Sequence, residues 1–537
     1  MSPTCLSRIF ARFSRNRYIQ KLRTSRPHST SGRPITPTTT TQIVFPKSIE
    51  KTQSDSSVSS EATGQAVHSS APATARAYTT ATTSSTTTLA NGADDSISAP
   101  HILVVGAAYG GLWAVMNILN LCDGNPQFPA IIPVPEIKLS PNVKPRITIL
   151  DERDGIFHSM GTPLLHVEHG LIEKAWVRFE EIPALQRDNV IIQQGSLAEI
   201  DPLQKRAYWK AYKSQADESN KVINYDYLIA ATGLTRDWPI VPKSLTYAGY
   251  TQDANSHIAQ IKNCTDEYPV VVIGGGAVGT EFAAEIKHHH PTLRVVLIHS
   301  RKTLLSNEPL PEEFTEKALN HMRDIGVEVL LETRVLSESH EGEAYYKRVK
   351  LSNGEHIMAG HTIWATKRHA PRTSFLPPEA LDEEGYVKVL PTMQFCATIP
   401  NSTFHFAAGD ITSWSGIRRV GRAFSMGQCA GVNVMKAIAI QSSNTSPSVP
   451  PPKTVSSNDE EKSNKDDEDK AKTTKMAEFP VVPPMISLAL GDTAFMYHPD
   501  SGVSGGKELF VSSFGKDLGL TVCWGYLKLP VPEHKEE

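Results

Sequence analysis

The stretch "VVVIGGGAVGTEFAAEI" at residues 270–286 decides the fold class, because a β-branched run leads through a glycine turn into a helical pattern. Gly274, Gly276 and Gly279 lie in G-x-G-x-x-G register. The first glycine permits a tight turn, the second lets the backbone approach a pyrophosphate, and the third packs the helix on the strand. The N-terminus of the helix then faces the phosphates. The pattern predicts a dinucleotide-binding unit of strand, turn and helix.

A second stretch, "HILVVGAAYGGL" at residues 101–112, repeats this layout with one change. Gly106 and Gly111 hold the first and third glycine positions, and Ala108 stands in the middle. One methyl group narrows the approach of a pyrophosphate without closing it. We therefore expect a second dinucleotide-binding turn at the start of the folded chain.

The residue that ends the next strand of each unit bears on the ribose of the ligand. After "RITIL", Asp151 or Glu152 could hold a ribose hydroxyl, although a proline-rich insertion places this strand further along the chain than usual. After "LRVVLI" no acid follows, and four residues could instead face a 2′-phosphate, which favours NADPH; a solvated basic turn explains them equally well. These residues are His299, Ser300, Arg301 and Lys302.

Three later strand ends complete the pattern. "YDYLIAATG" (225–233) and "GHTIWATK" (360–367) each end an apolar strand in Ala-Thr, and each lies past one of the glycine turns. "FHFAAGDITSW" (404–414) ends in Gly-Asp before a helical pattern. Asp410 either leads that helix or bonds the ribityl chain of a flavin. Strands that alternate with helices predict an α/β class with parallel sheets.

In this order, the motifs resemble the two-dinucleotide-binding flavoproteins, and most closely the apoptosis-inducing-factor-like branch that includes the ferroptosis suppressor proteins. "EFAAEIKHHHPTLRVVLIHS", "FHSMGTPLLH" and "ISLALGDTAF" carry the likeness, which covers about 100–440 and 480–530. The resemblance implies two doubly wound, Rossmann-like domains, with the NAD(P) domain inserted in the FAD domain, and a small C-terminal α+β segment.

The resemblance also implies site residues, with FAD as the bound cofactor and NADH or NADPH as co-substrate. Those expected at FAD are Gly106, Ala108, Gly111, Asp151, Thr232, Gly233 and Asp410. Those expected at NAD(P)H are Gly274, Gly276, Gly279 and Arg301, the last by the argument from charge given above. The two catalytic candidates are Glu281 near the nicotinamide and Lys243 near the flavin. Lys367 departs from the family pattern, which has glycine after Ala-Thr.

These motifs and shifts in composition predict six regions. Ser, Thr and Pro dominate the first region from about residue 27 to residue 99, and prolines with dense charges mark the fifth region, so both stretches are expected to be disordered. The regions are a presequence and linker at 1–99, the first part of an FAD domain at 100–265, an NAD(P) domain at 266–390, the second part of the FAD domain at 391–440, an insertion at 441–478 and a C-terminal segment at 479–537.

The first 33 residues have the composition of a mitochondrial presequence. They hold eight Arg or Lys and no acid, with apolar residues at helical spacing between the arginines. A basic arm that binds polyanions is the alternative. Because the sequence starts Met-Ser and not Met-Gly, we expect no myristoylation. The net charge of −3 gives no general attraction to nucleic acid, and no apolar run is long enough to span a bilayer.

The cysteines bear on the reaction. The chain has six, with no C-x-x-C pair and no metal-ligand spacing, which argues against a disulfide reductase. Reduced flavin would then serve a substrate directly, and the resemblance implies a quinone. Two alternatives stay open: a flavoprotein acting on a specialised metabolite, and a signalling factor that binds nucleic acid.

Three further features are expected to be structural. "KHHHP" (287–291) is expected to be a solvated face with no metal, because adjacent histidines point in different directions. His158 is expected to be a structural histidine. The stretch "LGLTVCWGYLKLPV" near the C-terminus could give peripheral membrane contact, but a core strand is favoured.

Overall fold

The computed structural model describes residues 99–128, 144–212, 220–340, 345–366, 370–396, 398–445 and 475–530. The predicted presequence and almost all of the linker, residues 446–474 of the predicted insertion, and Lys367 lie outside these ranges. No helix within them is long and apolar enough to cross a membrane.

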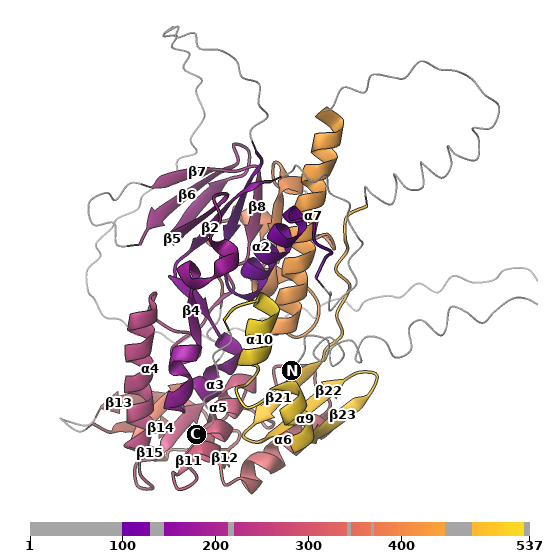
Figure 1. Cartoon of the computed structure of the whole chain (residues 1–537). Coiled ribbons are helices and arrows are strands. Elements are labelled where there is room, and N and C mark those ends of the chain that lie inside the picture. The colour runs from indigo at the N-terminus through magenta and orange to yellow at the C-terminus, as the bar shows by residue number, and fades with distance from the viewer. Residues whose placement is uncertain are drawn as a thin grey trace, which may run out of the picture. The chain divides into compact units, whose positions relative to one another are not determined.

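A seven-stranded sheet forms the first part of the fold (Figure 1). Its strand order is β19-β8-β1-β2-β5-β6-β7, and the first five strands are parallel. The strand β19 comes from late in the sequence and pairs with β8, so a segment that returns to this sheet forms one of its edges. The strands are β1 (His101–Val105), β2 (Arg146–Asp151), β5 (Val190–Asp201), β6 (Arg206–Ala211), β7 (Lys221–Asn224), β8 (Tyr227–Ala230) and β19 (His405–Ala407).

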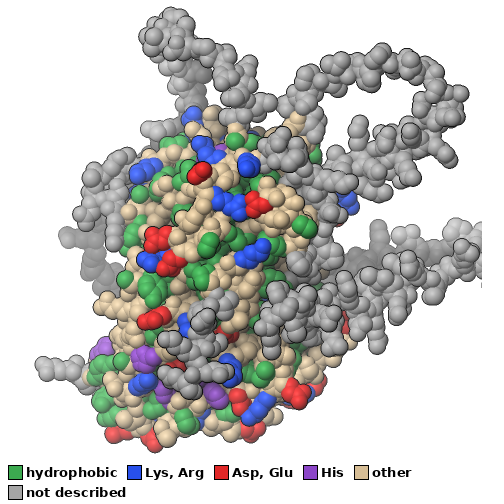
Figure 2. All heavy atoms as spheres, in the orientation of Figure 1, with side chains coloured by type: hydrophobic (Ala, Val, Ile, Leu, Met, Phe, Trp, Pro, Cys, Tyr) green, Lys and Arg blue, Asp and Glu red, His purple; other side chains and the backbone are tan. Residues whose placement is uncertain are grey.

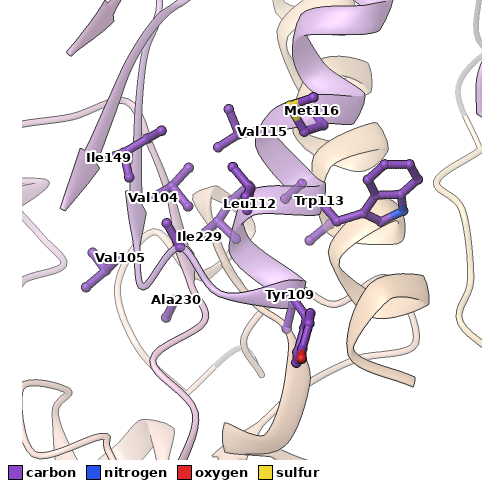
Figure 3. Packing of buried hydrophobic residues seen from close by; sticks show 14 of the residues in the cluster. Val104, Val105, Tyr109, Leu112, Trp113, Val115, Met116, Ile149, Ile229 and Ala230 are labelled. Atoms are coloured by element: carbon purple, nitrogen blue, oxygen red, sulfur yellow. The ribbon is translucent and has the colours of Figure 1, made fainter. Parts of the chain in front are cut away.

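Two helices that pack on each other cover this sheet: α2 (Tyr109–Cys122) and α7 (Val420–Thr445). The side chains of β1 are buried along its whole length, as expected for a parallel strand with both faces covered. In Figure 3, Leu112 and Val115 of α2 lie beside Val104 and Ile149 of the sheet. This packing fixes the helix directly after the first glycine turn.

A second, four-stranded parallel sheet has the order β12-β11-β10-β16. Alternate residues of its strands face two different layers. Val270 and Val272 pack with two helices, whereas Val271 and Ile273 pack with a small antiparallel sheet. The elements are β10 (Val270–Ile273), β11 (Val295–Ile298), β12 (Glu328–Leu330), β16 (His361–Trp364), helices α5 (Ala277–His289) and α6 (Glu312–Asp324), and the antiparallel strands β13 (Val335–His340), β14 (Lys347–Leu351) and β15 (His356–Ala359).

A two-stranded antiparallel ribbon brings together the segment that precedes the second sheet in the sequence and the segment that follows it. Here β9 (Leu234–Thr235) pairs with β17 (Ala370–Pro371). The remaining elements up to α7 are short apart from one helix. They are β3 (Gly155–Phe157), α3 (Thr162–Leu165), β4 (Trp176–Arg178), α4 (Tyr247–Lys262), β18 (Val387–Lys388) and β20 (Thr412–Ser413).

The C-terminal segment is α+β, as predicted. An antiparallel sheet of β21 (Ile486–Leu490), β22 (Thr493–His498) and β23 (Gly502–Gly506) is followed by α9 (Lys507–Ser513) and α10 (Leu520–Leu527). Its strand β21 contacts α5, and its helix α10 contacts α2. The segment therefore touches the helix that follows each glycine turn.

The expected core strand near the C-terminus is wrong: this stretch forms helix α10. A short apolar run lacks the periodicity that would distinguish a strand from a buried helix, so the pattern alone could not give the correct secondary structure. Its burial was predicted correctly, because Trp524 is fully buried and its Nε1 donates to the carbonyl oxygen of Lys174 at 3.1 Å. That side chain is therefore held in the protein core and does not face a membrane.

Candidate functional site

The two glycine turns have the same backbone construction. Gly106 and Gly274 both have positive φ, +87° and +118°, which favours glycine. A Cβ added to Gly106 would lie 2.6 Å from the carbonyl oxygen of Ala231, and one added to Gly274 would lie 2.5 Å from that of Ala365. Each Ala-Thr strand end therefore closes against its own turn, which explains why the sequence repeats this pair.

The third glycine of each turn brings the helix against the strand. A Cβ added to Gly111 would lie 1.8 Å from the carbonyl oxygen of Gly106. A Cβ added to Gly279 would lie 1.8 Å from that of Gly274. No side chain fits at such a distance, so both positions require glycine for packing.

The middle position is different because it faces open space. Ala108 is exposed, and a Cβ added to Gly276 would meet no atom within 4 Å. These residues precede α2 and α5, and neither helix has a side-chain cap at its first turn. Uncapped backbone N–H groups at a helix N-terminus suit a phosphate ligand. The fold itself thus tolerates Ala108, and its methyl group would meet only the ligand.

At the end of β2, Asp151 holds the first turn. Its Oδ2 accepts a hydrogen bond from the backbone N–H of Ala107 at 2.6 Å, and its Oδ1 accepts one from that of Arg153 at 2.8 Å. Burial raises the pKa of Asp151, opposed by the Arg153 guanidinium and these bonds. The neighbouring Glu152 pairs with Arg372 instead. Of the two acids proposed from sequence, Asp151 is the one at the turn.

At the matching place in the second sheet, the residue after β11 is His299. Its Nδ1 accepts a hydrogen bond from the backbone N–H of Gly275 at 3.1 Å, and its Nε2 lies 3.1 Å from the Ser306 hydroxyl. The side chain is buried, whereas Arg301, two residues on, is exposed. A histidine thus makes the contact with the turn that Asp151 makes in the first sheet.

The Gly-Asp motif lies between β19 and α7. Gly409 has a φ of +79°, and Asp410 follows it with its Oδ2 3.9 Å from Nη2 of Arg236. Arg418 donates to the carbonyl oxygen of Asp410 at 3.3 Å. Because β19, β8, β1 and β2 are parallel, their carboxyl ends place Asp410 and Thr232 at the same sheet edge as the first turn.

A buried arginine beside Asp410 was missed by the sequence reasoning. Arg422 lies in the first turn of α7 and donates to the Thr412 hydroxyl at 3.3 Å. Its Nε and Nη1 are buried without a hydrogen-bond partner in the part of the chain that the structure describes. Burial lowers the pKa of Arg422 to about 10. Unpartnered donors beside the Gly-Asp motif fit a ligand rich in acceptor oxygens, and the arginines of "SGIRRVGR" were the available signal.

Thr232 and Gly233 connect this edge to the returning chain. The Thr232 hydroxyl donates to the carbonyl oxygen of Arg372 at 2.6 Å, and the Arg372 N–H donates to that of Gly233 at 3.0 Å. The pair therefore holds the β9–β17 ribbon in place beside the first turn.

The two catalytic candidates lie in different surroundings. Glu281 is in α5, where its Oε1 accepts from the backbone N–H of Ala489 in β21 at 3.2 Å, and burial raises its pKa to about 8. Lys243 is 66% exposed and lies 3.6 Å from Asp253. The two candidates thus have different partners: Asp253 for Lys243 and the Ala489 backbone for Glu281.

His158 has a structural hydrogen-bond pattern. Its Nε2 donates to the carbonyl oxygen of Leu518 at 3.1 Å, so its Nδ1 accepts from the Tyr109 hydroxyl at 3.0 Å. Burial lowers the pKa of His158 to about 4, which keeps the ring neutral at pH 7. The ring links the C-terminal segment to the first glycine turn.

The described thiols form no disulfide. Cys122, Cys264, Cys396, Cys429 and Cys523 are all free. Burial raises the pKa of Cys122 to about 11 and that of Cys264 and Cys429 to about 12. Among the described residues, no group of histidine, cysteine and acidic side chains could hold a metal ion.

Comparison with known proteins gives the family of the chain. Residues 100–427 match the family model described as pyridine nucleotide-disulphide oxidoreductase. The oxidoreductase OXR1 of Ajellomyces capsulatus is 39% identical over 436 residues, covering 80% of this chain and 87% of the relative. Ferroptosis suppressor protein 1 of Mus musculus is 27% identical over 271 residues, covering 49% and 62%.

Solved structures share the fold. An NAD-dependent persulfide reductase from A. fulgidus superposes with a TM-score of 0.52 at 18% identity, over 74% of this chain and 63% of that one. An engineered water-forming NADPH oxidase gives 0.51 at 20% identity, over 74% of each chain. With the two glycine turns and the Gly-Asp edge, these matches confirm the two-domain Rossmann-like prediction. The chain belongs to the pyridine nucleotide-disulphide oxidoreductase family and is an FAD- and NAD(P)H-dependent oxidoreductase.

Proposed function

We propose that this enzyme passes the reducing equivalents of NAD(P)H to a quinone-type acceptor. The observation that carries the proposal is the state of the thiols. The described cysteines are unpaired, and the buried ones are protonated, so these residues offer no dithiol relay. Electrons then leave the cofactor directly for the acceptor, and the likeness to the ferroptosis suppressor proteins favours a quinone.

The chain supplies binding and orientation. The first turn, Asp151, Asp410 and Arg422 would hold FAD, and the second turn would hold NAD(P)H. When bound, FAD supplies the two-electron chemistry that couples oxidation of NAD(P)H to reduction of the acceptor. The overall reaction takes one hydride from NAD(P)H and one proton from solvent, and it gives NAD(P)⁺ and a quinol.

The test is anaerobic flavin reduction followed by reoxidation. Purified protein should be yellow, should lose its colour with NADPH or NADH, and should recover it faster with a soluble short-chain quinone than with oxygen alone. Absence of flavin, or quinone reoxidation no faster than oxygen alone, would overturn the proposal.

Thiol alkylation supplies the control. Treatment of the NADPH-reduced enzyme with N-ethylmaleimide should leave quinone turnover unchanged, because the described buried thiols are protonated and sheltered. Inactivation that requires prior reduction would instead reveal a working thiol pair.

The surface and the leader bear on where the enzyme acts. On the face shown in Figure 2, basic and acidic side chains are interspersed, so the described part of that face offers no continuous basic track for nucleic acid.

We propose mitochondrial targeting from the composition of residues 1–33. Fusion of residues 1–40 to a fluorescent protein should direct it to mitochondria, and a diffuse signal would count against targeting.

A further inference from the structure

Three titratable side chains follow one another along α5. Glu281, Glu285 and His289 are spaced four residues apart, so one helical turn separates each from the next. The helix packs on β21, whose Ala489 N–H donates to Oε1 of Glu281. Glu281 is the residue expected at the nicotinamide, and His289 is the last residue of the helix. The row therefore runs from the nucleotide end of α5 to its far end.

Glu285 is the buried member of this row. It is 2% exposed, and its Oε1 has no hydrogen-bond partner within the described part of the chain. Burial raises the pKa of Glu285, opposed by His289, by His288 and by the Gly491 backbone. Burying a carboxyl group with one oxygen unbonded costs stability, which a purely structural contact would avoid. Glu285 is thus a candidate for handling a proton.

His289 connects Glu285 to the surface. Its Nε2 lies 3.6 Å from Oε2 of Glu285, and its Nδ1 lies 3.7 Å from Oε2 of Glu168. The side chain of His289 is 27% exposed and that of Glu168 is 43% exposed. Of the adjacent histidines expected to be solvated, His288 is exposed, whereas His289 lies between two acids. An imidazole in this position can take a proton at one nitrogen and release one from the other.

The groups around the row leave His289 as the link to solvent. Within the described part of the chain, none of the other nearby groups forms an ion pair or hydrogen bond with Glu281 or Glu285. The other titratable or charged groups near the row, from the elements packed around it, are Lys262, His288, His290, His321 and Asp492.

We propose that His289 and Glu285 relay a proton from solvent to Glu281 while the acceptor is reduced. His289 accepts a proton at Nδ1 from bulk water, beside Glu168, and releases one from Nε2 to Oε2 of Glu285. Side chains one turn apart have Cβ atoms about 5–6 Å apart, a span that a single water bridges. Oε1 of Glu285 passes a proton through that water to Glu281, which gives it to the acceptor.

The proton balance matches the overall reaction. One proton enters at His289 and one leaves from Glu281, which equals the single proton that the reaction takes from solvent, and no electron moves along the row. His289 and Glu285 touch neither cofactor nor acceptor and act only through Glu281. The proposal rests on the proposed function for its need of one proton per hydride, a need shared by any acceptor that is reduced by a hydride and a proton.

Chemical rescue tests the relay. In His289→Ala, turnover of a short-chain quinone at saturating NADPH should fall at least about tenfold and become slower in D2O, because a positioned proton-transfer group contributes about 100-fold or more. Added imidazole should restore turnover and remove the dependence on D2O. His288→Ala, an exposed neighbour, is the matched control and should keep its turnover without imidazole. Unchanged turnover in His289→Ala, or a loss that imidazole does not restore in folded, flavin-loaded protein, would overturn the proposal.

The buried acid is tested by a conservative pair. Glu285→Gln cannot pass a proton and should be as slow as His289→Ala, whereas Glu285→Asp keeps a carboxyl group and should recover part of the rate. Both variants should unfold at similar temperatures. Equal rates in Glu285→Gln and Glu285→Asp would show that the carboxyl group carries no proton.

Infrared spectroscopy of the flavin-loaded enzyme without nucleotide needs no turnover. The C=O stretch of protonated Glu285, identified by its loss in Glu285→Gln, should disappear as the pH is raised. His289→Ala removes a group that lowers the pKa of Glu285, so the band should persist to higher pH. A band that titrates identically in the wild type and in His289→Ala would show that the two side chains are not coupled and would overturn the relay.

Oxygen separates failure of the relay from failure of the proposed acceptor. Reduction of oxygen to hydrogen peroxide also takes one proton per hydride, so the same variants can be compared in that reaction. If the wild type reduces no quinone but His289→Ala slows peroxide formation, only the acceptor proposal fails. If the wild type reduces quinone and His289→Ala does so equally fast, only the relay fails.

Discussion

Glu281 holds a proton at neutral pH, because burial raises the pKa of its carboxyl to about 8. The rate of flavin reduction by NADPH should therefore change with an apparent pKa near 8. Glu281→Gln keeps an acceptor for the Ala489 N–H and removes the titration, so it should abolish that inflection. Glu313→Gln, on the exposed face of α6, is the control. Stopped-flow absorbance between pH 6 and 9 checks this, and an unchanged inflection in Glu281→Gln would contradict it.

Asp151 should decide whether FAD is retained. Asp151→Ala removes the acceptor for the Ala107 N–H and leaves that donor without its partner, so purified protein should contain less flavin per chain. Glu152→Ala is the matched neighbour; it loses a partly buried ion pair, worth about 1 kcal/mol or less, and should keep its flavin. The ratio of flavin to protein absorbance measures this. Equal flavin content in the two variants would show that Asp151 is not needed.

At this scale the sequence identified residue types but not their partners. The strand-end pattern alone left Asp151 and Glu152 as alternatives, and only the resemblance favoured Asp151, since the direction of each side chain decides which one meets the turn. It also noted that His299 follows the strand without indicating that its ring replaces a carboxylate. Arg422 was missed because an arginine is ordinarily exposed, and the group of arginines in its segment does not show which one is buried.

At the scale of elements, the glycine turns predict a separation of folding from binding. Gly279→Ala places a Cβ 1.8 Å from the carbonyl oxygen of Gly274, so α5 must shift, at a cost of about 1–3 kcal/mol or more. In Gly276→Ala the added Cβ meets no atom within 4 Å, so the variant should fold normally but bind NADP⁺ more weakly, because the methyl group would face a bound pyrophosphate. Thermal unfolding and NADP⁺ titration measure the two effects. Equal losses of stability in both variants would contradict this.

The strands and helices around these turns could be predicted because local pattern and tertiary role agree there. A β-branched run, glycines at fixed spacing and an apolar helix point to one structure. Helix α10 was predicted as a strand because its apolar residues carry no periodicity, and only packing against α2 decides its form. The β21–β23 sheet against α5 depends on contacts between residues more than 190 positions apart, which local pattern does not contain.

At the scale of the whole molecule, three buried histidines should make folding pH-dependent. Nδ1 of His257 in α4 lies 3.1 Å from Nε2 of His361 in β16, and the His166 ring meets the His257 ring edge-on with centroids 5.9 Å apart, so the three side chains form one cluster. Burial lowers the pKa of His166 to about 3 and that of His361 to about 4, and it lowers the pKa of His257 well below its usual value. Lys347 and Glu338 are the charged groups that act on His361.

The sign of the effect follows from these pKa values. Between about pH 6.5 and pH 4 these histidines bind protons in the unfolded chain that they do not bind in the folded chain, so their contribution to stability is complete above pH 6.5 and is lost as the pH decreases. The raised pKa of Glu281 acts in the opposite direction, but it is one group against the three histidines. Each fully titrating histidine contributes about 1.4 kcal/mol per pH unit. Urea denaturation at pH 7.5, 6 and 5 should show this fall, and His361→Asn should reduce the slope. A wild-type stability that stays level from pH 7.5 to 5 would contradict the prediction.

The β9–β17 ribbon also bears on how such a molecule could arise. The chain leaves the first domain through Leu234–Thr235 and returns to it through Ala370–Pro371. These two strands pair with each other, so they lie one strand spacing apart, about 4.8 Å. The segment between these strands, residues 236–369, therefore begins and ends at neighbouring positions. A domain whose two ends lie close together can be inserted into another domain without changing the path of the surrounding chain. A gene for the nicotinamide half could thus have been inserted in one recombination event. The same adjacency makes a circular permutant opened within the excursion a reasonable starting point for engineering.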